Sequence, residues 1–156
     1  GYVKPTPIQQ LAIPLIMSGK DVVASSITGS GKTAAFLLPI IQRYYHAAAV
    51  GYIRTLIVTP TRELAIQIIN NFKNLINSKT GSLPRNWRQF NTTPITTFEK
   101  QSISCYLEPG RIIDLVMNSR SIGIENLEMI VFDEADKLLE LGFEAEIKQI
   151  MSHTHS

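Results

Sequence analysis

The sequence predicts an α/β fold in which helices cover both faces of a parallel β-sheet. Short apolar runs rich in Val and Ile alternate with longer stretches whose apolar residues recur at helical spacing. The short runs are nearly continuous in apolar residues, which is typical of strands that are buried on both faces. The chain has 156 residues, of which 44% are hydrophobic, so it is long enough for one domain with its own core. In such folds, ligands bind at the carboxyl ends of the strands.

The first predicted element is a helix that begins after Thr6 and ends at Gly19. Thr6 can cap the helix, Pro7 fits its first turn, and Gly19 favours its end.

A strand, a loop and a second helix are expected next. Residues 21–25 are expected to form a buried strand, residues 28–31 a glycine-rich turn, and residues 32–48 a helix rich in Ala, Leu and Ile. The same order then recurs, which is the pattern that produces a parallel sheet.

The second unit consists of a strand at residues 55–58, which ends at Pro60, and an amphipathic helix with apolar residues from Leu64 to Ile76. Near the end of the chain, residues 129–132 form another apolar run that leads into an acidic cluster. Residues 105–107 read as the end of a strand and residues 110–118 as a helix. Residues 77–100 have no sustained period and receive no assignment.

The composition excludes several classes of protein. The 15 Lys and Arg residues against 13 Asp and Glu give a net charge of only +2, so there is no basic block that would indicate nucleic-acid binding by itself. The single cysteine, Cys105, excludes an internal disulfide and a zinc site made of paired cysteines, which favours an intracellular protein. No apolar run approaches the ~20 residues of a membrane span, and the first residues do not resemble a signal peptide.

The strongest chemical signal is the segment Thr28, Gly29, Ser30, Gly31, Lys32 and Thr33. Glycines between a strand and a helix let backbone N–H groups surround a phosphate chain, and the helix N-terminus adds positive potential. Lys32 would reach the β- and γ-phosphates and the Thr33 hydroxyl would bind Mg²⁺. The alternative is an ordinary glycine-rich turn with a solvated lysine.

A second signal is the acidic cluster Asp133, Glu134 and Asp136, which follows the last apolar run. A carboxylate at a strand end is where a phosphate-loop nucleotidase binds Mg²⁺, so Asp133 would hold the metal and Glu134 would deprotonate the attacking water. By itself the cluster is also a good helix start. Its pairing with the phosphate loop favours the catalytic interpretation.

Together these motifs resemble the first of the two RecA-like domains of a DEAD-box RNA helicase. Residues 4–9 are similar to the Q motif, in which the amide of Gln9 would read the adenine edge. Pro60, Thr61, Arg62 and Glu63 are similar to an RNA-contacting motif, and Asp133–Asp136 is the motif that names the family. Residues 28–36 and 138–143 resemble the nucleolar branch that assists ribosome assembly.

The middle of the chain departs from the family pattern. Glu108, Pro109, Gly110 and Arg111 are similar to a second RNA-contacting motif, but a carboxylate stands where the family has Thr and would repel phosphate. No Gly-Gly pair occurs between the two RNA motifs. Residues 77–108 are therefore expected to be an atypical segment inside an otherwise matching domain.

The resemblance implies an ATP- and Mg²⁺-dependent RNA helicase that separates duplexes locally and contacts the RNA backbone with low sequence preference. Residues 1–156 would be its N-terminal ATP-binding domain, truncated at both ends. Asp136 would couple this domain to the second RecA-like domain, which carries an arginine finger and is missing from this chain.

Without that arginine, the chain should bind ATP and hydrolyse little, since arginine fingers contribute ~10³–10⁵ in rate. The resemblance further implies a monomer, no membrane contact, and a nuclear or nucleolar location. Two alternatives to the RNA helicase interpretation stay open. The chain could be a non-catalytic or degenerate nucleotide-binding module, or an unrelated phosphate-loop nucleotidase.

Overall fold

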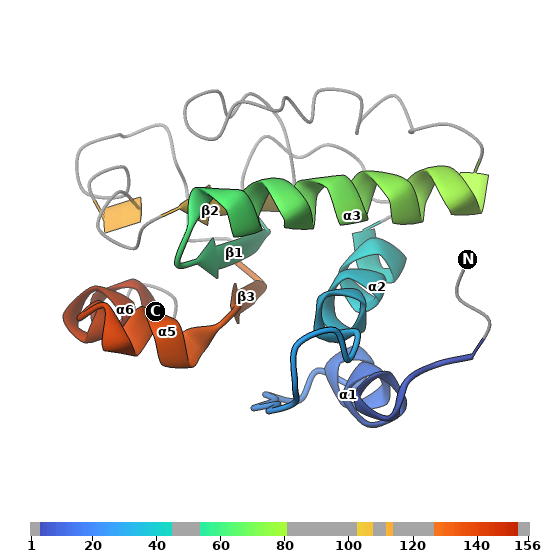
Figure 1. Ribbon diagram of the computed structural model, residues 1–156, viewed down its shortest axis with the longest axis horizontal. Helices are drawn as coiled ribbons and strands as arrows, with labels where there is room; N and C mark the ends of the chain where they lie inside the picture. The colour runs from blue at the N-terminus through green and yellow to red at the C-terminus, as the bar shows by residue number, and fades with distance from the viewer. Residues whose placement is uncertain (1–3, 45–53, 81–102, 108–111, 114–126, 153–156) are drawn as a thin grey trace.

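The computed structural model describes residues 4–44, 54–80, 103–107, 112–113 and 127–152. Its elements, in chain order, are α1 (Pro7–Met17), α2 (Lys32–Tyr44), β1 (Thr55–Thr59), α3 (Arg62–Thr80), β2 (Ile103–Leu107), β3 (Met129–Phe132), α5 (Ala135–Glu140) and α6 (Glu144–Ser152) (Figure 1). Ile112 and Ile113 are helical, and the rest of the helix predicted at residues 110–118 lies outside the described residues.

The three strands form a parallel sheet in the order β2-β1-β3, which confirms the predicted α/β class. Val58 lies opposite Phe132 in the register, so β1 and β3 end at the same edge of the sheet. Asp133 extends this pairing, because its N–H donates to the carbonyl of Val58 at 2.9 Å. The residues that follow β1 and β3 are therefore neighbours.

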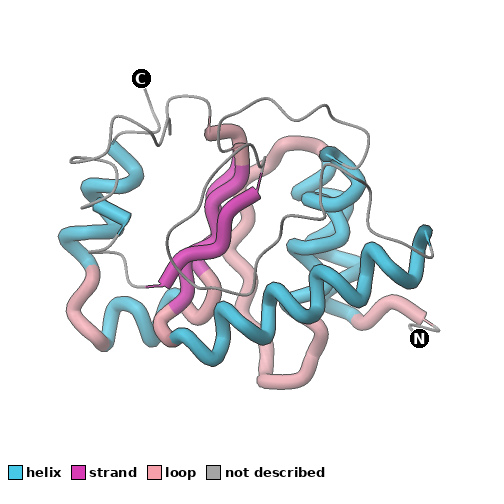
Figure 2. The backbone as a smooth tube through the Cα atoms, turned by 90° about the horizontal axis from the view of Figure 1, so that it is seen from above, coloured by secondary structure: helices cyan, strands magenta, loops and turns pink. Residues whose placement is uncertain are grey.

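Helices cover both faces of the sheet, and the strands lie between them (Figure 2). On one face Ile57 packs with α2 and α3 in a core that includes Leu37, Ile40 and Phe72. On the other face Leu56 and Val58 pack with α5, α6 and residues 112–113; the buried members there include Ile112, Leu138 and Ile150. Because successive strand side chains point to opposite faces, these apolar runs supply two cores at once.

The strand predicted at residues 21–25 is not formed. Residues 21–27 adopt neither strand nor helix, and Val23 and Ile27 are 104% and 82% exposed. A strand needs a hydrogen-bonded neighbour. In the part of the chain that the structure describes, the sheet consists of β2, β1 and β3 alone. Apolar composition therefore gave the wrong prediction, since it cannot report whether a partner strand is present.

Candidate nucleotide-binding site

The glycine-rich loop enters α2 through two backbone positions that favour glycine. Gly29 has φ +78° and Gly31 has φ +93°, a region that costs other residues roughly 1–2 kcal/mol. The loop is closed at its base by the Ser26 and Ser30 hydroxyls, whose oxygen atoms lie 2.6 Å apart. At the start of α2, the N–H of Ala35 donates to the Gly31 carbonyl at 3.1 Å. The N–H groups before it belong to the first turn, which has no earlier helical carbonyls to bind.

Lys32 is directed into this loop. Its ammonium donates to the carbonyl of Ser26 and, at 3.2 Å, to the carbonyl of Ile27. A cation that is held inside a loop of this shape is available to an anion, because a phosphate oxygen binds an ammonium more strongly than a neutral carbonyl does.

Gln9 connects α1 to the loop. Its side chain is 3% exposed, its Oε1 accepts from the N–H of Thr6 at 3.0 Å, and its Nε2 donates to the Gly31 carbonyl at 3.2 Å. An amide has two N–H groups and two carbonyl lone pairs, so one donor and one acceptor remain beyond these two bonds. Adenine recognition by Gln9 stays a prediction. The structure shows that the Gln9 amide is hydrogen-bonded to the glycine-rich loop at Gly31.

Asp133 follows β3, at the strand edge where the sequence predicts the metal ligand. Burial raises the pKa of its carboxyl above the ordinary value, and the negative charge of Glu134 raises it further. The N–H of Glu134, which donates to Asp133 Oδ1 at 3.1 Å, and the charge of Lys32 oppose this rise. The charge of Lys32 acts on Asp133, so the end of β3 lies near the glycine-rich loop.

Glu134 and Asp136 lie at the start of α5. Glu134 has φ +50°, and it is the only residue other than glycine with a positive φ in the described part of the chain. Its carboxylate lies 3.6 Å from the ammonium of Lys137. Asp136 is exposed, and its Oδ1 accepts the N–H of Lys137 at 3.0 Å.

The arrangement fits a nucleotide with Mg²⁺. Gly29 has open space within 4 Å of the position a Cβ would take, so the outer side of the loop can be approached closely. Thr6 has a buried Oγ1 without a hydrogen-bond partner among the described residues, next to the loop. Mg²⁺ needs only one or two protein oxygens when phosphates complete its shell, and the Thr33 hydroxyl and the Asp133 carboxylate could supply them.

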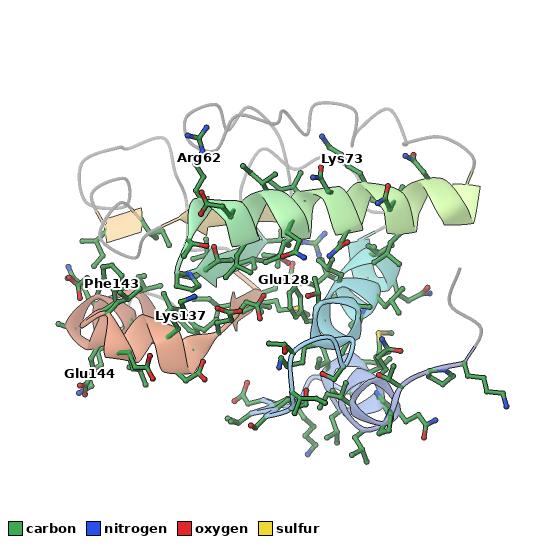
Figure 3. The ribbon with its side chains drawn as sticks, viewed as in Figure 1. Arg62, Lys73, Glu128, Lys137, Phe143 and Glu144 are labelled. Carbon is green, nitrogen blue, oxygen red and sulfur yellow. The ribbon has the colours of Figure 1, made fainter. Side chains whose placement is uncertain are left out.

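The predicted RNA-contacting residues follow β1. Pro60 is buried, Thr61 caps α3 by accepting the N–H of Leu64 at 3.4 Å, and Arg62 and Glu63 are exposed. Arg62 projects away from the sheet (Figure 3). Gly110 and Arg111 lie outside the described residues. The first motif therefore lies at the same sheet edge as Asp133, while the second is untested.

Comparison with known proteins identifies the family. The family model described as DEAD/DEAH box helicase matches residues 6–156. The chain belongs to the DEAD/DEAH box helicase family. It is 42% identical to the ATP-dependent RNA helicase DRS1 of Kluyveromyces lactis, covering 97% of this chain and 21% of that protein. It is 44% identical to DEAD-box ATP-dependent RNA helicase 28 of rice, covering 97% of this chain and 19% of that protein.

Solved helicase structures show that the fold is RecA-like. A hypothetical ATP-dependent RNA helicase of Sulfolobus tokodaii matches 99% of this chain and 44% of that one with a TM-score of 0.75 and 31% identity. The RNA helicase Prp28 of Chaetomium thermophilum, bound to ADP, matches 97% of this chain and 38% of that one with a TM-score of 0.77 and 29% identity. This helicase chain spans about a fifth of the length of its curated relatives.

Membership of this family excludes an unrelated phosphate-loop nucleotidase. Within the described ranges, none of the helices has the length and apolar content that crossing a membrane requires.

Two features of the site were not predicted from the sequence. The Lys137–Glu134 ion pair could have been found from the three-residue spacing of opposite charges on a helix. The second feature is Glu128, which binds Arg43 at 3.3 Å and also Arg54, and which joins α2 to the sheet (Figure 3). No sequence signal connects Glu128 with residues so distant along the chain.

Proposed function

We propose that this chain is the ATP-binding, N-terminal RecA-like half of an ATP-dependent RNA helicase. The observation that carries the proposal is the geometry of the glycine-rich loop, in which the Lys32 ammonium donates to the carbonyls of Ser26 and Ile27 at the start of α2. Asp133 follows β3, and the charge of Lys32 acts on its carboxyl. A phosphate chain with its metal requires a cation and a carboxylate of this kind.

Each residue has a proposed role. Gln9 reads the adenine edge, and the loop from Thr28 to Thr33 surrounds the phosphates with Lys32 as their cation. Thr33 and Asp133 hold Mg²⁺, partly through water, and Glu134 accepts the proton of the attacking water. Mg²⁺ supplies charge neutralisation on the phosphates when it is bound.

The RNA-binding half of the proposal rests on residues 60–63, whose cap hydroxyl and exposed Arg62 suit a phosphate backbone. Gly110 and Arg111 would extend this track, and Asp136 would couple ATP binding to a second RecA-like domain. Contacts of this kind give low sequence preference. RNA would be the partner of a monomeric chain. A nuclear or nucleolar role in ribosome biogenesis is proposed from the resemblance of residues 28–36 and 138–143.

The test is a titration of the 156-residue chain with a fluorescent ATP analogue and Mg²⁺, with GTP as competitor. Saturable binding is expected, lost in Lys32→Ala and poorly displaced by GTP. Lys20→Ala is the matched control, because it removes the same charge from an exposed lysine ahead of the loop. Unchanged affinity in Lys32→Ala would exclude the phosphate-loop assignment. Folded protein without any binding would favour the degenerate module.

Turnover is expected to need the second domain. With 156 residues alone, hydrolysis should be slower by the ~10³–10⁵ that an arginine finger contributes. When the chain is joined to a second domain, Glu134→Gln should keep ATP affinity and abolish hydrolysis, and this comparison tests Glu134 as the base.

A further inference from the structure

Glu134 combines a fixed backbone with a carboxylate that has few partners. Its φ of +50° sets the direction in which the side chain leaves the chain, at the junction of β3 and α5. The carboxylate makes no cap hydrogen bond to α5. Strained backbone of this kind costs roughly 1–3 kcal/mol and occurs most often at functional sites.

Lys137 is the cation that faces this carboxylate. Its ammonium lies 3.6 Å from Glu134 Oε2, with the two side chains 50% and 31% exposed. Lys137 is fixed to the same turn at its backbone, where its N–H donates to Asp136 Oδ1 at 3.0 Å. Lys137 lies at the start of α5, close to where β3 ends (Figure 3).

The charges around Glu134 limit the orientations that its carboxylate can adopt. Asp133 and Asp136 lie one and two residues from Glu134, and the charge of Glu134 is felt at Asp133. Like charges repel one another, so the negative charge of Asp133 disfavours orientations that bring the Glu134 carboxylate closer to it. The ammonium of Lys137, which lies on α5, favours the orientation in which the Glu134 carboxylate faces it.

We propose that Lys137 is a positioning residue that holds the Glu134 carboxylate in the orientation from which it accepts the proton of the attacking water. The proposal rests on the proposed function of this site. Lys137 does not touch the nucleotide or the water, and it acts only through Glu134. General-base catalysis requires the base within hydrogen-bond reach of its proton, so loss of orientation lowers the rate of the chemical step.

The experiment measures RNA-stimulated ATP hydrolysis by this chain joined to the second helicase domain of its longer relatives. Lys137→Met removes the charge and keeps the aliphatic stem. We expect kcat to fall about two- to fivefold with unchanged KM for ATP, which at 1.36 kcal/mol per tenfold equals about 0.4–1 kcal/mol. That is the range measured for exposed ion pairs. Lys137→Arg should restore kcat.

Lys148→Met is the matched control. Lys148 makes an ion pair of the same kind on α6, with its ammonium 2.6 Å from Glu144 Oε1, and it has no place in the proposed site. Its kcat and KM should equal those of the unmodified protein. Lys137→Gln provides a second neutral variant, and thermal unfolding of each variant separates loss of positioning from loss of folding.

The outcomes separate the two proposals. Unchanged kcat in both neutral variants, or an equal fall in Lys148→Met, overturns the positioning role of Lys137. A rise in KM for ATP with constant kcat also overturns it. If Lys32→Ala and Glu134→Gln turn over ATP as fast as the unmodified protein, the proposed function fails first, whatever Lys137→Met does.

Discussion

Gly31 is a residue at which α1 and the glycine-rich loop are in close contact. A Cβ built there would lie 2.4 Å from Gln9 Nε2 and 3.2 Å from Thr6 Oγ1. Gln9 is buried and hydrogen-bonded at both ends of its amide, so it cannot move aside without breaking its bond to the Gly31 carbonyl. The glycine is therefore needed for space as well as for its positive φ.

We expect Gly31→Ala to lower the free energy of unfolding by about 2–5 kcal/mol. The positive φ contributes about 1–2 kcal/mol and the broken buried hydrogen bond about 1–3 kcal/mol. Gly29→Ala is the control, because Gly29 also has a positive φ but open space around its Cβ position, and it should lose only the first amount. Urea unfolding measures both, and equal losses would contradict the role given to the Gln9 contact.

Asp133 is expected to destabilise the nucleotide-free chain. Its pKa is raised in the folded state, so the folded chain holds its proton at pH values where the unfolded chain has lost it. Stability therefore falls as pH rises from the ordinary aspartate pKa through the raised one. Asp133→Asn should raise the melting temperature at neutral pH, and this gain should disappear in acid, where both side chains are neutral. A gain that is independent of pH would contradict this account.

Roles for Lys32, Thr33 and Asp133 can be assigned from the sequence because each lies in a short pattern that contains the whole signal. These roles stay predictions; the structure shows that Lys32 lies in the glycine-rich loop and that Asp133 follows β3. The second bond of Gln9, to the Gly31 carbonyl, was not predictable, because it depends on how α1 docks against a loop 22 residues away.

At the scale of elements, strands were predicted correctly where a partner is present. β1 and β3 were assigned from mainly apolar runs, and β1 is fully buried. Residues 21–25 have a similar apolar centre between Asp21 and Ser25 but form no strand, since hydrogen-bonded pairing is a property of the sheet and not of the segment. β2 was expected only from its last three residues, because the polar Ser104 interrupts the apolar run after Ile103.

Glu128 stabilises the packing of α2 against the sheet. Its carboxylate is 31% exposed and binds Arg43 of α2 and Arg54, which precedes β1, while its N–H donates to the Arg54 carbonyl at 2.8 Å. α2 begins with Lys32 and has Arg43 in its last turn, so this ion pair fixes the C-terminal end of the helix whose N-terminal residue is the proposed phosphate-binding lysine.

We expect Glu128→Gln to lower the free energy of unfolding by about 1–2 kcal/mol, because a carboxylate shared by two arginines loses two charge-assisted bonds. The loss should shrink in 1 M salt, where the Debye length falls to about 3 Å. Glu144→Gln is the control, since Glu144 pairs with Lys148 at the surface, where solvent screens the two charges, and its loss should be clearly smaller. A loss at Glu128 no larger than at Glu144 would show that the second arginine contributes nothing.

At the scale of the whole molecule, the α/β class can be predicted from the sequence, because short apolar runs alternate with stretches whose apolar residues recur at helical spacing. Apolar runs such as residues 55–58 and 129–132 contribute to cores on both faces of the sheet, as the prediction required. Strand order was not predicted, since patterning shows that a strand is buried but not which strand lies beside it. The extent of the domain as residues 1–156 stays a prediction.

The exposed segment at residues 21–27 has a consequence for how the protein behaves in solution. In the described part of the chain, β3 is hydrogen-bonded on one side only, to β1, and Val23 and Ile27 are exposed apolar side chains. An open sheet edge can pair with a strand of another molecule, and exposed apolar side chains on the surface also favour association. The mean molar mass of the isolated chain, measured by light scattering, should therefore equal that of the monomer in dilute solution and rise at high concentration, and it should rise less when Val23 and Ile27 are replaced by lysine.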